Sequence, residues 1–490
     1  HTNIERYIMK KNSIKLNYFF NLLYQLLSII IPVITTPYLS RVLSPKGIGE
    51  YNYSFSITTL FMILSVLGSH GYAQREIAFN QNNKEKISKL FFEILIIRLI
   101  ACLITTPIFF YVAITQQKYS NLLLSQYIMI LSTIFDISWF FQGLEEFKKL
   151  AIRNISLKII TTIAIFIFVN KDSDLIIYSL LMSISLLMSS LTMWPYCRDY
   201  IEIISLKKIN IRQHFRPILM FFIPVSAVYI YTSVDKILLG VLANDIEVGY
   251  YSQADRIVRL LLTVITSLGT VLLPRIANLL SNKDTLKVKS EIKKSILFVS
   301  FIGFPMCGGL IAISPIMIPW FLGKDFQASV LLVQFLSSLT LILGFSSVTG
   351  QAVLIPLKKQ NFYTVTVILG AIINIVGNFI LVPHFLSLGS VISTLISEVL
   401  VCALQTVVVF KILNLNYREI FIESKDYIIG SIIMTITLSL LVLKLEVSTF
   451  DLLITVLTGF IIYFSYLLIT KNILVINLIK NIRTKKFKSN

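Results

Sequence analysis

Residues 295–318 read SILFVSFIGFPMCGGLIAISPIMI, and no side chain in this stretch is charged. A helix needs roughly 20 apolar residues to cross about 30 Å of hydrocarbon, so the stretch is long enough to span a bilayer. Similar stretches recur along the whole chain of 490 residues, of which 56% are hydrophobic and only 14% are charged. The sequence therefore predicts an all-α integral membrane protein and excludes a water-soluble enzyme.

Proline, glycine and charge clusters divide the chain into about fourteen candidate transmembrane helices. Each candidate is a mainly apolar segment bounded by polar or helix-breaking residues. The candidates are residues 16–41, 51–74, 88–113, 120–142, 151–169, 175–195, 217–241, 248–274, 295–318, 326–350, 361–382, 385–410, 427–443 and 449–470.

Positive charge is distributed unevenly over the connections between these spans. With the N-terminus inside, cytoplasmic segments and the adjoining inner ends of spans hold 33 of the 44 Lys and Arg residues, whereas outer connections together with Arg41 hold six. Cytoplasmic loops of membrane proteins carry this kind of excess, so both termini are predicted to be cytoplasmic. The net charge of +19 therefore indicates membrane topology, and we expect no nucleic-acid partner.

Two parts of the chain resemble each other. VLSPKGIGEYNYS begins at Val42, and VLANDIEVGYYSQ begins at Val241. The landmarks that recur 200 residues apart are Gly49 with Gly249 and Arg75 with Arg275. A further echo joins Gln142, Lys148 and Lys149 to Gln351, Lys358 and Lys359. Because the landmarks occur in the same order, they indicate an internal repeat.

The repeat predicts two lobes of six spans each. An even number of spans gives both lobes the same orientation, related by a pseudo-two-fold axis along the membrane normal, as in transporters with parallel repeats. Two further C-terminal helices would add lipid-facing surface. The predicted parts are an N-lobe at 16–196, a cytoplasmic connection at 197–216, a C-lobe at 217–410, spans 13 and 14 at 427–470, and a basic cytoplasmic tail at 471–490.

Charged side chains inside the predicted spans are the strongest functional candidates. Each costs on the order of 2.5 to 3.5 kcal/mol at the bilayer centre, so it needs a partner or a wet cavity. Asp255 and Arg259 have the i, i+4 spacing that lets them pair on one helix face. Such charges either bind an ionic substrate or simply neutralise one another. The basic candidates are Arg98, Lys158, Lys236, Arg256 and Arg259, and the acidic ones are Asp136, Asp235, Asp255 and Glu398.

Four segments carry a family resemblance: TTPYLSRVLSPKGIGEYNYS from Thr35, WFFQGLEEFKKL from Trp139, VDKILLGVLANDIEVGYYSQADRI from Val234 and VLLPRIANLL from Val271. Together they resemble the Wzx-type polysaccharide flippases of the multidrug/oligosaccharidyl-lipid/polysaccharide (MOP) superfamily. The resemblance covers nearly the whole chain. It implies two six-helix lobes that move an undecaprenyl-pyrophosphate-linked sugar repeat unit from the inner to the outer leaflet of a bacterial plasma membrane by alternating access.

The resemblance also bears on the substrate. Lipid II flippases of the same superfamily carry arginines in the first span, whereas this chain has no charge between Lys15 and Arg41, which argues against a peptidoglycan precursor. Abundant Ile, Asn and Lys suit an AT-rich genome and loosely favour a teichoic-acid or capsule unit of a Gram-positive bacterium. The expected partners are a lipid-linked oligosaccharide, membrane lipids and, as a further option, glycan polymerase or ligase machinery.

An anionic pyrophosphate needs cations at membrane depth. Arg256 and Arg259 are the predicted contacts, supported by Lys236. Asp235 and Asp255 are their predicted counter-ions. A plain salt bridge that holds the helices together is the alternative explanation for these charges.

Other charged residues lie at the ends of the spans or deeper in the first lobe. Arg75 and Arg41 would contact the headgroup at the inner and outer ends of the path, with membrane anchoring as the alternative. Asp136 and Glu398 are candidates for coupling to H+ or Na+, because a desolvated carboxylate can carry a proton. Arg98 is predicted to brace its own lobe.

The sequence contains no motif for catalysis or cofactor binding. The chain has no G-x-x-x-x-G-K-[ST] loop and no H-E-x-x-H, so we expect no nucleotide hydrolysis, no cofactor, and transport instead of enzymatic turnover. Its four cysteines lack metal-ligand spacing. Two alternatives stay open. One is a multidrug or organic-cation antiporter of the same superfamily with an acidic cavity, and the other is an integral-membrane glycan polymerase or ligase with a large external loop.

Overall fold

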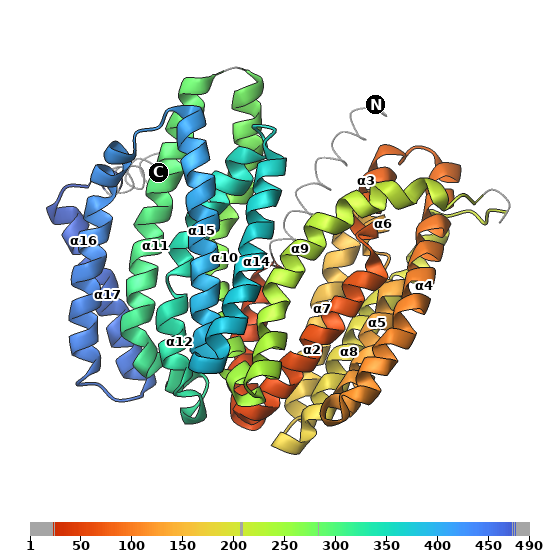
Figure 1. Ribbon diagram of the computed structural model, residues 1–490, viewed down its shortest axis with the longest axis horizontal. Coiled ribbons are helices and arrows are strands. Elements are labelled where there is room, and N and C mark those ends of the chain that lie inside the picture. Colours follow the sequence, from red (N-terminus) through yellow and green to blue (C-terminus); the bar gives the residue numbers. More distant parts are fainter. Residues whose placement is uncertain are drawn as a thin grey trace, which may run out of the picture. The chain divides into compact units, whose positions relative to one another are not determined.

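The computed structural model describes residues 25–205, 209–282 and 284–472, together with residues 23, 474 and 476. The regular elements in these ranges are helices (Figure 1). Thirteen helical segments of the described chain are long and apolar enough to cross a membrane. The predicted all-helical membrane class is therefore confirmed. The start of the first predicted span and most of the predicted basic tail, 471–490, lie outside the described residues.

Contacts along the chain define two compact units, residues 1–240 and 241–490. The first unit begins with the helix Gln25–Val42. Its further helices are α2 (Ser44–Val66), α3 (Ser69–Phe79), α4 (Lys84–Thr115), α5 (Ser120–Phe135), α6 (Ser138–Gly143), α7 (Phe147–Phe168), α8 (Leu175–Leu191) and α9 (Arg212–Leu242).

The second unit contains the remaining helices. They are α10 (Asp245–Ser281), α11 (Thr285–Phe321), α12 (Ser329–Leu336), α13 (Leu339–Ser346), a π-helical segment (Ser347–Leu354), α14 (Gln360–Phe385), α15 (Ser387–Leu413), α16 (Tyr417–Val442) and α17 (Thr449–Ile469). Helices α16 and α17, the two predicted extra spans, pack against each other and against α11 (Figure 1).

Helix α9 corresponds to the predicted seventh span but groups with the first unit. It is not one of the thirteen segments above, although its stretch 217–234 carries no charge. Its N-terminal turn is fixed to α3 and α4, because Nε2 of His214 lies 2.8 Å from Oε2 of Glu93 and Nδ1 lies 2.7 Å from the hydroxyl of Tyr72. All three side chains are buried. The repeat had predicted α9 as the first span of the second lobe.

The second predicted span is interrupted between α2 and α3. Leu67 and Gly68 have φ angles of 51° and 74°, in the left-handed region that ends a helix. A β-carbon on Gly68 would lie 2.5 Å from the backbone nitrogen of Phe222 in α9. The interruption therefore depends on a glycine, both for its φ angle and for the close approach of α9.

We expect Gly68→Ala to destabilise the protein by about 2 kcal/mol or more, because the new methyl group meets a positive φ and the backbone of α9. Thermal unfolding of the purified protein in detergent measures the effect. Gly309→Ala is the matched control, since a β-carbon there meets only Cε of Met434, at 3.8 Å. Equal unfolding temperatures for the two variants would contradict this explanation.

The fourth span of the first unit and the third span of the second unit are also irregular. In the first unit α5 ends at Phe135 and α6 begins at Ser138, with Asp136 extended between them at φ −71° and ψ 105°. In the second unit α12, α13 and the π-helical segment follow one another across 329–354. Discontinuous and π-type helices at membrane depth are typical of binding sites in transporters. The break at Asp136 is surrounded by a core that includes Phe91, Trp139 and Phe140.

Candidate functional site

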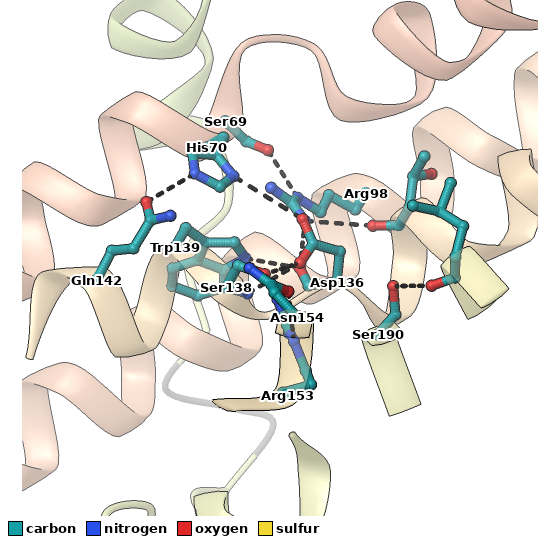
Figure 2. Close-up of polar contacts among 12 residues, drawn as sticks. Ser69, His70, Arg98, Asp136, Ser138, Trp139, Gln142, Arg153, Asn154 and Ser190 are labelled. Atoms are coloured by element: carbon teal, nitrogen blue, oxygen red, sulfur yellow. Dashed lines mark hydrogen bonds and ion pairs between the residues drawn. The ribbon is translucent and has the colours of Figure 1, made fainter. Parts of the chain in front are cut away.

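Arg98 occupies the centre of a polar cluster at the break in the fourth span (Figure 2). It extends from α4 and is fully buried, with 0% of its surface exposed. Nε donates to the hydroxyl of Ser69 at 2.8 Å, and Nη1 donates to the carbonyls of Thr133 at 3.2 Å and Asp136 at 2.5 Å. These carbonyls lose helical partners where α5 ends. The guanidinium therefore satisfies the C-terminal end of α5, where the helix dipole favours a cation.

The carboxylate of Asp136 faces the other half of the break. Ser138 is the first residue of α6. Oδ1 of Asp136 accepts hydrogen bonds from the Ser138 backbone N–H, at 3.0 Å, and from the Ser138 hydroxyl. Its Oδ2 lies 3.9 Å from Nδ1 of His70 on α3. The Trp139 indole donates to the Asp136 carbonyl at 3.1 Å. The two halves of the span are thus held by side chains in place of helical hydrogen bonds.

Half-buried polar side chains surround this carboxylate. Nε2 of His70 lies 3.0 Å from Oε1 of Gln142 on α6. On α7, Arg153 donates to Oδ1 of Asn154 at 2.8 Å and to the hydroxyl of Ser138 at 3.3 Å. Figure 2 shows these groups together around Asp136. Helices α3, α6 and α7 thus bring imidazole, amide and guanidinium groups to the carboxylate at the break in the first unit.

In the second unit, Asp255 and Arg259 form the ion pair that their spacing predicts. Nε of Arg259 lies 2.6 Å from Oδ1 of Asp255 on the same face of α10. Asp255 is buried, whereas about a third of the Arg259 side chain, 36%, is exposed. Arg256, which directly follows Asp255 on α10, is half-buried. One end of the Arg259 guanidinium is held by the carboxylate, and its side chain still has accessible surface.

The remaining predicted residues are divided between the two units. Asp235 is buried and Lys236 is half-buried, and both lie on α9 in the first unit. Glu398 is buried on α15 in the second unit. Arg41 is exposed, and its Nη1 donates to the carbonyl of Pro37 at 3.0 Å. Within either unit, the structure brings together Asp136 with Arg98 and Asp255 with Arg259.

The repeat-related residues Arg75 and Arg275 have similar surroundings. Each forms an ion pair with a glutamate, Arg75 with Glu76 at 2.8 Å and Arg275 with Glu291 at 2.9 Å. The Arg75 side chain is about half exposed and that of Arg275 is 62% exposed. The guanidinium of Arg75 also lies over the ring of Phe221, 5.1 Å from its centre. These arginines are available at a surface and are not buried in a helix bundle.

An apolar groove lies in the second unit, between α11, α16 and α17. Its volume is about 500 Å³, and α10 contributes Leu261 to its wall. The lining consists of aliphatic, aromatic and glycine residues, which include Phe301, Pro305, Gly309 and Phe460. A groove of this size and lining suits a flexible hydrocarbon chain. Within the described residues no group of three potential ligands forms a metal site.

A comparison with family models places this chain. The model of the family described as "Polysaccharide biosynthesis protein" matches residues 14–280, which are 267 of the 490 residues. The chain belongs to this polysaccharide biosynthesis family.

Two relatives of this family member are provisionally named O-antigen transporters. The protein from Shigella dysenteriae is 27% identical over 76% of this chain and 93% of its own length. The protein from Escherichia coli strain K12 is 25% identical over 77% of this chain and 92% of its own length. The similarity to both extends over most of each protein, so it is not confined to one motif.

Solved structures share the fold of this family member. A lipid II flippase, MurJ, in an inward closed conformation superimposes with a TM-score of 0.56 over 96% of this chain and all of its own, at 17% identity. An inward-facing multidrug resistance transporter of the MATE family and MOP superfamily gives a TM-score of 0.64 over 80% of this chain and 94% of its own, at 13% identity. At these identities the likeness shows that this chain shares the fold of both transporters.

The meeting of several members of the polar cluster could not be predicted from the sequence. His70, Gln142, Arg153 and Asn154 lie on three different helices, and their spacing along the chain carries no sign that they meet. One available signal was Gln142, because a polar side chain in the apolar run WFFQG is costly at membrane depth unless it has a partner. The repeat pointed to the same glutamine.

Proposed function

We infer that this protein is a flippase that moves an undecaprenyl-pyrophosphate-linked repeat unit of a surface polysaccharide from the inner to the outer leaflet. The bacterial plasma membrane is the proposed location, with both termini in the cytoplasm. The observation that carries the proposal is the family match, together with the relatives that are named for O-antigen transport. The charged residues and the groove of the second unit supply the chemistry that such a cargo requires.

The pyrophosphate group calls for cations at membrane depth. Arg259 offers a guanidinium that is oriented by Asp255 at 2.6 Å and still has accessible surface. Arg256 lies three residues before Arg259 on the same helix. A guanidinium binds phosphate oxygens through charge-assisted, often bidentate hydrogen bonds. We assign the pyrophosphate contact to Arg256 and Arg259, with Lys236 as support and Asp235 and Asp255 as counter-ions.

The ends of the path and the energy source involve further residues of the proposal. Arg75, exposed beside Glu76, would collect the anionic headgroup at the cytoplasmic end. Arg41, also exposed, would contact it at the outer end. Asp136 and Glu398 are the proposed carboxylates for coupling to a cation gradient. An expected partner outside the protein is the polymerase or ligase machinery that consumes the flipped unit.

The lipid tail needs an apolar surface. The groove between α11, α16 and α17 has a volume of about 500 Å³ and no charged lining residue. It is built by the two helices beyond the repeat, α16 and α17, together with α11 and Leu261 of α10. Because α10 also carries Arg259, a single helix of the second unit serves both the groove and the cationic pair. We assign the undecaprenyl chain to this groove.

A complementation experiment tests both the function and the groove. Cells that lack the gene should accumulate the lipid-linked repeat unit and lose the polysaccharide from their surface. Wild type and Gly309→Ala should restore it. Gly309→Phe should restore at least about tenfold less, because the phenyl ring occupies the groove and removes its apolar contact area. Equal protein levels in the membrane are the control for folding.

Two outcomes would count against the proposal. Normal surface polysaccharide in cells without the gene would contradict the function itself. Full restoration by Gly309→Phe would leave the function standing and contradict the assignment of the lipid tail to the groove. The chemical identity of the missing polysaccharide would also show whether the cargo is an O-antigen, capsule or teichoic-acid unit.

A further inference from the structure

We propose that the polar cluster at the break in the fourth span is a binding site for sugar hydroxyl groups. The site consists of His70 on α3, Asp136 at the break, Gln142 on α6 and Asn154 on α7. It lies wholly within the first unit, and the pyrophosphate contacts proposed above belong mainly to the second. The inference rests on the proposed function, because it assigns the glycan part of the same cargo.

Some hydrogen-bonding groups of this cluster have no partner within the cluster. Among the residues that the structure describes, Nε2 of Gln142 and Nδ2 of Asn154 donate to no other group. In the described part of the chain, the one polar contact of Asp136 Oδ2 is with His70, at 3.9 Å. Polar groups without partners are costly inside a membrane protein, so they call for water or a ligand. All four side chains are half-buried and therefore accessible.

The unpaired amide donors and carboxylate oxygen of the cluster determine which ligand can bind there. A sugar hydroxyl both donates and accepts a hydrogen bond, so it can donate to the Asp136 carboxylate and accept from the amide of Gln142 or Asn154. A phosphate oxygen only accepts, and the negative charge of Asp136 would repel it. The Arg98 guanidinium behind Asp136 is fully buried, and its Nε and Nη1 donate to Ser69 and to backbone carbonyls. Its Nη2 has no hydrogen-bond partner among the described residues, but this atom is buried and so is not accessible to a ligand. The cluster therefore favours an uncharged, hydroxyl-rich ligand over a phosphate.

The construction of the break keeps these groups in position. Arg98 holds the end of α5, and Ser138 bonds to Oδ1 of Asp136, so that Oδ2 faces His70 (Figure 2). Arg153 fixes Oδ1 of Asn154 at 2.8 Å and so leaves its amide NH₂ for a ligand. A site that is held by surrounding packing and hydrogen bonds loses little entropy when it binds. Discontinuous helices play this part in other transporters.

The test compares two lipids that differ only in the sugar. The purified protein in lipid nanodiscs is titrated with the lipid-linked repeat unit, extracted from cells that lack the gene, and with undecaprenyl pyrophosphate alone. We expect Gln142→Ala and Asn154→Ala each to weaken binding of the sugar-bearing lipid by about five- to tenfold. Binding of undecaprenyl pyrophosphate should change by less than about twofold. Gln117→Ala and Asn121→Ala are matched controls at exposed positions.

Every other outcome of this titration contradicts either the sugar site or the proposed function. Equal weakening of both lipids would mean that the two residues support the fold or the phosphate site, and no change with either lipid would show that they do not touch the glycan. Both results reject the sugar site and leave the proposed function intact. Failure of the wild-type protein to bind either lipid would instead reject the proposed function, and the sugar site with it.

Discussion

Replacing Arg259 with alanine is expected to lower transport of the lipid-linked repeat unit by at least about tenfold, while the protein still accumulates in the membrane. A hydrogen bond to a charged group contributes about 1.5 to 3 kcal/mol, which corresponds to roughly ten- to a hundredfold in binding. The side chain is accessible on one side and is oriented by Asp255 on the other. Surface polysaccharide in a complemented deletion strain measures the loss, with the exposed Arg418→Ala as control.

A charge exchange separates this role from a purely structural ion pair. The double variant Asp255→Arg with Arg259→Asp keeps an i, i+4 pair but moves the cation by one helical turn. If the pair only stabilises α10, the double variant should recover the transport that Arg259→Ala loses. If Arg259 contacts pyrophosphate, transport should stay low. Wild-type transport by Arg259→Ala would remove the residue from the site altogether.

The second large effect is expected at Arg98, and it concerns stability. Arg98→Met should lower the free energy of unfolding by about 3 to 5 kcal/mol, the usual cost of removing one side of a buried charged network. The change leaves the carbonyls of Thr133 and Asp136 and the hydroxyl of Ser69 without their guanidinium. The free energy of unfolding of Arg98→Lys should fall between those of the wild type and Arg98→Met, because an ammonium keeps the charge but not the planar set of donors.

An exposed arginine provides the comparison. Arg75 pairs with Glu76 at 2.8 Å, but its side chain is about half exposed. Arg75→Ala should therefore cost less than about 1 kcal/mol. Thermal unfolding of purified protein measures all three variants. Unfolding of Arg98→Met at the wild-type temperature would mean that the break in the fourth span does not depend on the buried guanidinium.

The spans could be predicted from the sequence because apolar length is a local property. Uncharged runs such as 295–318 fall inside single helices, in this case α11. The interruptions were harder to place. Pro107 lies within the continuous helix α4, and Pro305 within α11, since neighbouring groups in a membrane bundle can satisfy the freed carbonyls. The real breaks, at Gly68 and Asp136, depend on contacts with α9 and with Arg98 that come from other parts of the chain.

The candidate site could be predicted only in part for the same reason. The ion pair of Asp255 and Arg259 follows from i, i+4 spacing on one helix, so it could be predicted from the sequence. Arg98 and Asp136 were recognisable as charges inside spans. Their meeting with His70 and Gln142 requires the rotation and depth of three helices, which hydrophobic patterns do not specify. The apolar groove likewise arises from packing between helices and has no sequence motif.

The most direct measurement is transport of the cargo by the purified protein in vesicles. The lipid-linked repeat unit is placed in both leaflets, and an impermeant reagent that oxidises sugar diols is added outside. Vesicles without protein should expose about half of the units, and vesicles with wild-type protein should expose nearly all of them, more slowly with Arg259→Ala. An exposed fraction that stays at half with the wild-type protein, under an imposed proton or sodium gradient as well as without one, would contradict the proposal that this protein flips lipid-linked glycans.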